Sequence, residues 1–342
     1  MHRYIIRRLL ILPLLLFGVS VLIFGMTQLL TPYERASLYV SDIPKRVGAL
    51  DDIVKKYGLD APFYIQYGRW LNKVLHGDLG FSKVGKQPVA DLIKNHFPAT
   101  LELALWCIGP LIYVGIQLGI ISAVKQNSPL DWFVRTFAIV GWSFPLFVFG
   151  LLALMIFYAK LGWFPAGRLS DWATQVVSSG EFRVITKMNT IDALLNGRLD
   201  IFWDALRHLI LPVITLSYLD WAILLRVTRS SMLEVLRQEY VTTARAKGLE
   251  EPKVIQRHAR PNAMIPVVTM GGMTLVGLLS GLVITETIFN YRGMGWFFAS
   301  AASQLDVITV LGFAMFNGTI LVLGNLGVDI LYGFVDPRVR LS

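Results

Sequence analysis

Five long stretches of this chain contain no charged residue, and this feature constrains the fold more than any other. A bilayer core of about 30 Å requires about 20 apolar residues in a helix, and each stretch reaches that length. Hydrophobic residues make up 54% of the 342 residues, which is far too apolar for an ordinary soluble domain. The sequence therefore predicts an all-α membrane protein with spans at 9–30, 103–124, 136–159, 263–285 and 307–328.

A sixth stretch, residues 209–225, is interrupted by Asp220. We count it as a span because the polar segment 239–261 and the C-terminal tail would otherwise lie on opposite sides of the membrane. The first stretch is too long for the apolar region of a signal peptide, and Gly25-Met26-Thr27 offers no small-x-small cleavage site. We therefore expect six spans, an uncleaved first helix and both termini on one face.

The distribution of basic residues predicts the orientation. Of the 32 Lys and Arg, 15 fall in the two tails and in the short segments that share their side. Sixteen others lie in two long loops, 31–97 and 160–208, where charge is a poor guide to topology. Only Arg292 lies in a short loop on the other side. This bias predicts that both termini are cytoplasmic.

The net charge of +9 does not indicate a nucleic-acid-binding protein. The bases are scattered over membrane flanks, and acids nearly balance them in both long loops, so no basic patch with stacking aromatics is present. The single cysteine, Cys107, falls in the middle of a predicted span and has no intrachain disulfide partner. The five histidines are widely spread and lack the i, i+4 spacing of a metal site.

A polar segment between two predicted spans has the pattern of two short helices joined by a glycine. Residues 239–247 are good helix formers and end in basic residues, which a helix C-terminus favours. Gly248 supplies a left-handed stop. Glu250, Glu251 and Pro252 are typical of the first turn of a second helix, which we expect to end at Pro261.

This segment resembles the cytoplasmic coupling loop of ABC-importer permeases. The family pattern begins with E-A-A, followed by three residues and a glycine. A leucine-proline pair comes later, and its proline lies thirteen residues after the glycine. In this chain the second alanine, the glycine and the proline of the pattern are present as Ala244, Gly248 and Pro261. Thr242 and Thr243 replace the glutamate and the first alanine of the pattern, and Arg260 replaces the leucine. In the peptide-permease branch, however, the usual sequence is Y-V-x-T-A-R-A-K-G-L, which residues 240–249 match closely. The resemblance implies contact with an ATPase through Tyr240, Thr243, Ala244, Arg245, Ala246, Lys247, Gly248 and Leu249, with Ala244 and Ala246 small enough for close approach.

Other segments are similar to the same family along nearly the whole chain, at 4–13, 57–71, 76–82, 161–170, 288–296 and 328–340. The resemblance implies the type I ABC importer fold, with six spans and an external subdomain after the first. The expected domains are a tail and first helix at 1–30, the external subdomain at 31–97, and a permease core at 98–342 that holds the coupling loop at 229–262. The external subdomain is expected to have Tyr57, Tyr64, Tyr67 and Trp70 as its core. Val89, Leu92, Ile93 and Phe97 fall at helical spacing, and we expect them along the membrane surface.

The resemblance also implies the partners and the place in the cell. The complex would contain a second homologous permease, two cytoplasmic ATPases and an extracytoplasmic solute-binding protein, in a bacterial or archaeal cytoplasmic membrane. We expect no cofactor in this chain and no enzymatic activity, because the ATPases would bind ATP and Mg²⁺. The expected substrates are peptides or oligosaccharides, and metal chelates are a further possibility within the family.

One motif that suggests nucleotide binding is rejected. Residues 80–87 spell a phosphate-binding loop up to its last position, where Gln87 replaces the Ser or Thr that holds Mg²⁺. The segment is also predicted to lie outside the cell. An ion-gradient-driven transporter is the alternative function, but it predicts inverted repeats and broken helices that the sequence does not display.

Acidic residues near the predicted spans are the remaining candidates for function, because burying a carboxylate in a membrane is costly unless it meets water or a partner. Glu102, Glu286 and Asp329 fall at span ends, where pairing with a base is the ordinary explanation. Asp220 lies deeper and is the candidate for lining the solute path. The alternative for Asp220 is an ion pair with Arg226 on the same helix.

Overall fold

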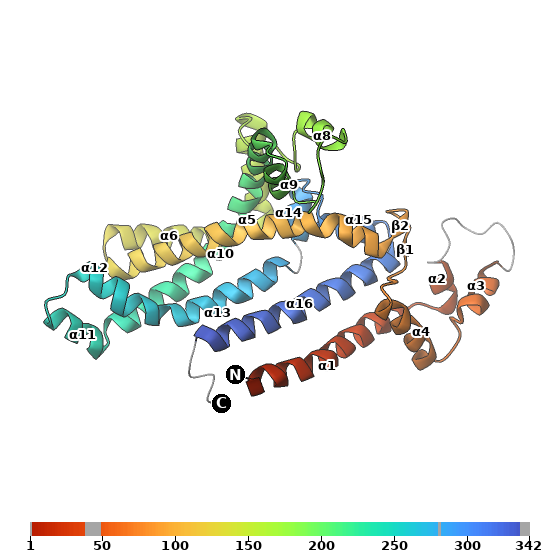
Figure 1. The fold of residues 1–342 in the computed structure, drawn as a ribbon, viewed down its shortest axis with the longest axis horizontal. Helices are drawn as coiled ribbons and strands as arrows, with labels where there is room; N and C mark the ends of the chain where they lie inside the picture. Colours follow the sequence, from red (N-terminus) through yellow and green to blue (C-terminus); the bar gives the residue numbers. More distant parts are fainter. Residues whose placement is uncertain (1, 38–48, 280–281, 336–342) are drawn as a thin grey trace.

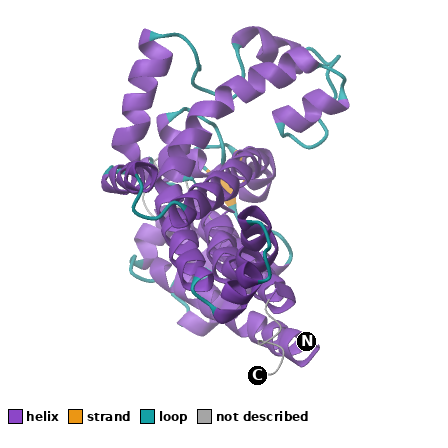
Figure 2. Ribbon diagram, turned by 90° about the vertical axis from the view of Figure 1, so that its left-hand side faces the viewer, coloured by secondary structure: helices purple, strands orange, loops and turns teal. Residues whose placement is uncertain are grey.

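The computed structural model describes residues 2–37, 49–279 and 282–335, and within these ranges it is almost entirely helical (Figures 1 and 2). Two two-residue strands, β1 (Phe81–Ser82) and β2 (Gln87–Pro88), form an antiparallel hairpin. The helices are α1 (His2–Thr27), α2 (Pro32–Ser37), α3 (Ala49–Tyr57), α4 (Phe63–Leu75), α5 (Val89–Val124), α6 (Pro129–Ser143), α7 (Leu146–Ala153), α8 (Asp171–Ser178), α9 (Asn189–Leu195), α10 (Leu199–Leu236), α11 (Glu239–Ala246), α12 (Glu251–Lys253), α13 (Arg260–Leu279), α14 (Val283–Ile288), α15 (Met294–Ser303) and α16 (Val307–Val335).

The long helices lie roughly along the longest dimension of the molecule (Figure 1). The small helices α2 to α4 lie at one end of it, α11 and α12 lie at the other, and α8 and α9 form a lobe that projects from the side. The start of α1 and the end of α16 lie close together, on the side away from α2 to α4. The coupling loop and the external subdomain are therefore at opposite ends of the bundle.

Four described helical stretches are long and apolar enough to cross a membrane, and there are up to six if each of two bent helix pairs counts as one span. This agrees with the predicted all-α membrane fold. The third predicted span is broken, however, because α6 and the helix at Leu146–Lys160 meet at 103°. Pro145 forces the preceding Phe144 into an extended conformation, with φ −85° and ψ 129°, which ends the helix rather than merely kinking it.

The fifth predicted span also differs from expectation at both ends. Pro261 does not end the second helix of the coupling loop, because α12 continues through π-helical turns at Val254–Ala259 into α13. Pro261 follows directly on those turns, so it falls where the regular i→i−4 hydrogen-bond ladder is already interrupted. At the other end α13 stops at Leu279, and Thr285 belongs to the separate helix α14.

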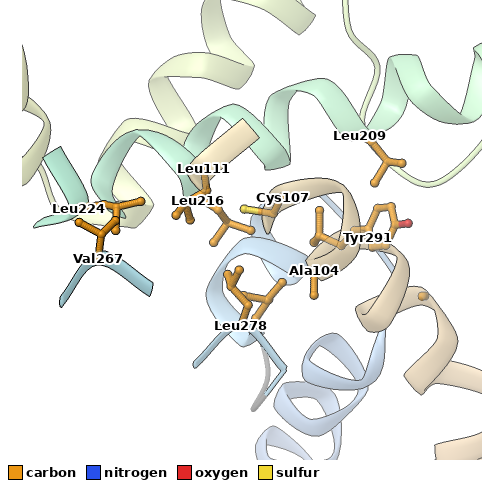
Figure 3. Close-up of a cluster of buried hydrophobic side chains, with 12 residues drawn as sticks. Ala104, Cys107, Leu111, Leu209, Leu216, Leu224, Val267, Leu278 and Tyr291 are labelled. Carbon is orange, nitrogen blue, oxygen red and sulfur yellow. The ribbon is translucent and has the colours of Figure 1, made fainter. Parts of the chain in front are cut away.

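Helices α5 and α10 form the centre of the bundle. Buried residues of both helices pack with Val267 and Leu278 of α13 and with Tyr291. Figure 3 shows Leu224 and Val267 facing one another, with Leu111 and Cys107 of α5 alongside. In a membrane such packing is driven by close van der Waals contact, which small residues at the crossing permit.

Gly119 is one such residue. A Cβ built on it would lie 2.5 Å from the Cβ of Thr228 and 2.9 Å from the carbonyl oxygen of Leu225 on α10. Gly115 and Gly119 therefore lie where α5 approaches α10 closely.

Gly119→Ala is expected to destabilise the protein by about 1–3 kcal/mol, the usual cost of overpacking. The measurement is thermal unfolding in detergent. Gly109→Ala on the same helix is the matched control, since its added methyl would meet nothing within 4 Å. Equal melting temperatures for the two variants would contradict the close contact.

The external subdomain at 31–97 divides into two parts in the structure, and residues 38–48 of it lie outside the described residues. Ala36, Val54 and Leu59 form the small core of α2 and α3. Tyr67 and Trp70 of α4 pack against Phe24 of α1, with ring centroids 5.6 and 5.3 Å away. Tyr57, at the end of α3, and Tyr64 of α4 were also expected in this core, but both are exposed.

The last part of that segment is the start of α5. Val89, Leu92 and Ile93 are at helical spacing as expected, but they do not lie on a surface. They are buried against α15 and α16, with Met294, Phe297, Ala301 and Phe313. The hairpin before them is tied to the start of α16, because the Ser82 hydroxyl donates to the Asp306 carboxylate at 2.7 Å.

Candidate functional site

The coupling loop is joined to the bundle almost without flexible linkers. Helix α10 ends at Leu236, and only two residues separate it from α11. On the other side, α12, the π-helical turns and α13 form one helical stretch from Glu251 to Leu279. A displacement of α11 and α12 is therefore transmitted directly to α10 and α13, which are central helices of the bundle.

Gly248 takes the left-handed conformation that the sequence predicted. Its φ is +76°, and a Cβ built on it would meet no atom within 4 Å. The requirement for glycine is therefore conformational and not steric, because L-residues with a branched Cβ rarely adopt this region. Gly248 sets the direction in which the chain leaves α11.

A charged pair spans the glycine. The Nε and Nη2 atoms of Arg245 donate to the two carboxylate oxygens of Glu251 at 3.0 and 2.7 Å. These hydrogen bonds hold the pKa of Glu251 below its usual value. Both side chains are about half exposed, so the pair adds little to overall stability. Its two-point geometry instead fixes the angle between α11 and α12.

The predicted contact residues divide into two faces. Val241 and Ala244 of α11 are buried against Val254 and the end of α10, so the small side chain of Ala244 serves packing within this chain. Ala244 is only 5% exposed, so it does not belong to the exposed face of α11. The exposed face comprises Tyr240, Thr243, Arg245, Ala246, Lys247, Gly248 and Leu249.

A second polar site lies at the other end of α5, where the second outer loop folds back on the bundle. Glu102, which is 1% exposed, accepts a hydrogen bond from Arg168 at 2.9 Å. It also accepts from the backbone N–H and hydroxyl of Thr190 at 2.7 and 2.8 Å, and from the Tyr291 hydroxyl at 2.8 Å. Burial raises the pKa of Tyr291 well above its usual value, so the phenol stays a donor.

We call these four residues the outer network. They come from α5, from the second outer loop on either side of α8, and from the loop between α14 and α15. The sequence singled out Glu102 and expected a basic partner, which the structure identifies as Arg168. The outer network therefore fastens the projecting lobe to the bundle.

Glu286 belongs to an adjoining cluster. It is fully buried and accepts hydrogen bonds from the Thr100 hydroxyl at 2.6 Å and from the backbone N–H of Trp296 at 2.8 Å. A Cβ on Gly293 would lie 2.6 Å from this carboxylate. Gly293, the first glycine in the sequence Y-R-G-M-G-W, is thus required because it packs against the buried carboxylate of Glu286. The sequence analysis did not identify this requirement.

Asp220 begins the second half of α10, which is bent by 48° from the first half. The side chain is half-buried. Within the part of the chain that the structure describes, no ion pair joins Asp220 to Arg226. The structure thus gives the pairing alternative no support.

The segment at 80–87 has none of the geometry of a phosphate-binding loop. It forms the β1–β2 hairpin, whereas a working loop connects a strand to the N-terminus of a helix. Among the described residues, no group of three or more His, Cys, Asp or Glu side chains is placed to hold a metal ion.

Comparison with known proteins agrees with the resemblance. Residues 115–341 match the family described as "Binding-protein-dependent transport system inner membrane component", and residues 1–104 match its N-terminal companion. A probable D,D-dipeptide transport system permease protein, DdpB, of Escherichia coli is 40% identical over 96% of this chain and 94% of its own length.

Two further relatives align over practically their whole length. The dipeptide transport system permease protein DppB of Alkalihalophilus pseudofirmus is 36% identical over 99% of this chain and 100% of its own. The oligopeptide transport system permease protein AppB of Bacillus subtilis is 36% identical over the same shares. The chain therefore belongs to the family of inner-membrane components of binding-protein-dependent ABC importers, in the branch of the dipeptide and oligopeptide permeases.

Proposed function

We propose that this chain forms one half of the translocation path of an ATP-driven importer for short peptides. The second half would be a homologous permease, and ATP and Mg²⁺ would be bound by two separate cytoplasmic ATPases. An extracytoplasmic solute-binding protein would deliver the substrate. The peptide substrate is supported by relatives whose names specify dipeptides or oligopeptides. Oligosaccharides are the second candidate.

The observation that carries the proposal is the direct helical connection of the coupling loop to α10 and α13. The exposed face of α11 would rest on one ATPase, and Val241, Ala244 and Val254 would anchor α11 to its own chain. When the ATPases close, α11 and α12 would move as one body and pull on both helices. Linked rigid bodies of this kind give alternating access.

The orientation is part of the proposal. We place the coupling loop and both termini in the cytoplasm, since 15 basic residues in short segments lie on that side and one lies on the other. The long helices support this arrangement, because the coupling loop and the α2–α4 subdomain lie at opposite ends of the bundle (Figure 1). The α8–α9 lobe and α2 to α4 would then face the solute-binding protein.

Asp220 is our candidate for the solute path. We expect Asp220→Leu to reduce uptake by about tenfold, the value of one lost hydrogen bond to a charged group, while the complex still assembles. Uptake and thermal stability are to be measured on the same variant, with Asp220→Asn as the isosteric control. Unchanged uptake together with lowered stability would remove Asp220 from the path.

The proposed function is tested by purifying the complex through a tag on this chain and reconstituting it in proteoliposomes. We expect co-purification of two ATPases and a second permease, and uptake of di- to oligopeptides that requires ATP and the binding protein. Uptake driven by a proton or sodium gradient without ATP would support the alternative of a secondary transporter. ATP-dependent uptake of oligosaccharides but not of peptides would correct the substrate alone.

A further inference from the structure

A groove of about 810 Å³ runs between α6 and α10. It begins among Ala138, Ile139, Ala222 and Leu225, and it ends at Arg237 and Gln238, the two residues between α10 and α11. Its α10 wall is one helix face, because its residues follow one another at intervals of three or four. The groove therefore leads from the adjoining ends of two predicted spans to the coupling loop.

The polar part of the groove is strongly basic. Arg135, Arg226, Arg229 and Arg237 line it, and Glu234 is the one acid among its lining residues. Arg229 is engaged by Asp131, to which it donates two hydrogen bonds at 3.0 and 2.9 Å. In the described part of the chain, no carboxylate lies within ion-pair distance of the other three arginines.

The apolar part lies deeper along the same two helices. Ala138, Ala222 and Leu225 are buried at its floor, while Ile139 is exposed beside them. On α6, the guanidinium of Arg135 stacks on the ring of Trp132 at 5.0 Å, and Trp132 and Phe133 are both more than half exposed. Along α6 and α10, the exposed aromatic pair Trp132 and Phe133 is thus followed by arginines without ion-pair partners among the described residues and then by the apolar floor, all within a few helical turns.

We propose that this groove binds an anionic phospholipid. The guanidinium groups of Arg135 and Arg226 would hold the phosphate, since arginine offers planar paired donors to phosphate oxygens. An acyl chain would lie over the floor formed by Ala138 and Ala222. Basic pockets between membrane helices bind anionic headgroups in this way. The lipid proposal rests on the proposed function at one point only, the assignment of the lipid to the cytoplasmic leaflet.

A lipid fits this groove better than an acidic protein segment. Its ligand must be negative near Arg226 and apolar one turn deeper at Ala222, and a phospholipid combines the two at this spacing. Inorganic phosphate satisfies only the first requirement. Because the groove ends at Arg237, bound lipid would also fill space next to the start of α11.

The test uses the complex purified through a tag on this chain and native mass spectrometry with added phosphatidylglycerol or phosphatidylcholine. We expect saturable, selective binding of phosphatidylglycerol that Arg135→Gln with Arg226→Gln weakens about tenfold or more. Arg183→Gln, an exposed arginine of the second outer loop, is the matched control and is expected to bind as the unaltered complex does. Excess inorganic phosphate should not displace the lipid.

Three outcomes would overturn the proposal. They are equal binding of phosphatidylcholine, binding that the double variant leaves unchanged, and displacement of the lipid by inorganic phosphate. If the double variant does not fold, a second experiment tests the proposal on the complex with both arginines intact. Brominated phosphatidylglycerol should quench its tryptophan fluorescence, and Trp132→Phe should remove part of that quenching. A cysteine at Ser230 that cross-links to another subunit would show that protein fills the groove, and the lipid would then be excluded.

Discussion

Replacing Gly248 by valine is expected to uncouple ATP hydrolysis from transport in a complex that still assembles. Gly248 has a φ of +76°, and a β-branched residue in this region costs about 1–3 kcal/mol. No other residue lies within 4 Å of the Cβ built on Gly248, so the strain arises within the local backbone and not from a clash with a neighbouring residue. The exposed chain at this point is free to relax into another conformation, which would change the angle between α11 and α12 and break the Arg245–Glu251 pair.

A coupling energy of this size corresponds to a loss of roughly 5- to 150-fold in peptide-stimulated ATP hydrolysis. The measurement compares that activity with complex assembly on the same preparation. Gly248→Asn should retain much of the activity, because Asn tolerates the left-handed region. Gly197→Val, at φ +67° between α9 and α10, imposes the same strain far from the coupling loop and is expected to leave coupling intact. Normal coupling in Gly248→Val would contradict the proposed role.

The parts of the structure that the sequence predicted well are those that local physics determines. Charge-free stretches of membrane length indicate spans without reference to any other part of the chain. Four of the predicted spans correspond to single helices long enough to cross a membrane, and the other two correspond to bent helix pairs. The two helices on either side of Gly248 were predicted for the same reason. A glycine that needs positive φ and a proline in a first turn are properties of a few adjacent residues.

The errors lie where distant residues decide the outcome. Whether a proline such as Pro145 bends a helix or ends it depends on what the following segment packs against. Helix α7 lies against α10 and α14, and that packing holds the 103° bend. The burial of Ala244 depends likewise on Val254, beyond the glycine, and its small size in the sequence gives no sign of that contact.

The outer network was beyond prediction from one sequence. Its hydrogen bonds join residues that are 66, 88 and 189 positions apart, and no local pattern marks Arg168 as the partner of Glu102. A buried acid near a span end indicated that some base must be close. Which base, and from which loop, follows only from the way that the second outer loop packs on α5 and Tyr291.

Arg168→Met is expected to be the most destabilising of the substitutions considered. Removing the arginine leaves Glu102 almost fully buried without its cationic partner, and breaking a buried pair in this way costs about 3–5 kcal/mol. The hydrogen bonds from Thr190 and Tyr291 remain, so the fold is expected to survive with a lower melting temperature. The measurement is thermal unfolding of the purified complex.

The double variant Glu102→Gln with Arg168→Met separates charge from packing. Gln keeps an acceptor for the Thr190 N–H but carries no charge, so we expect it to recover most of the lost stability, since replacing both partners of a buried pair is often neutral. Arg198→Met is the matched control. Its partner Asp200 is about half exposed, and a surface pair contributes about 0–1 kcal/mol.

Two results would count against the role of the outer network. If Arg168→Met and Arg198→Met melt alike, the Glu102–Arg168 pair is not desolvated as the structure indicates. If the double variant is no more stable than Arg168→Met, the loss comes from the packing of the arginine side chain on the Tyr291 ring, 5.4 Å from its centre, rather than from the unpaired charge. Recovery in the double variant would show that the charge of Glu102 is what fastens the second outer loop to α5.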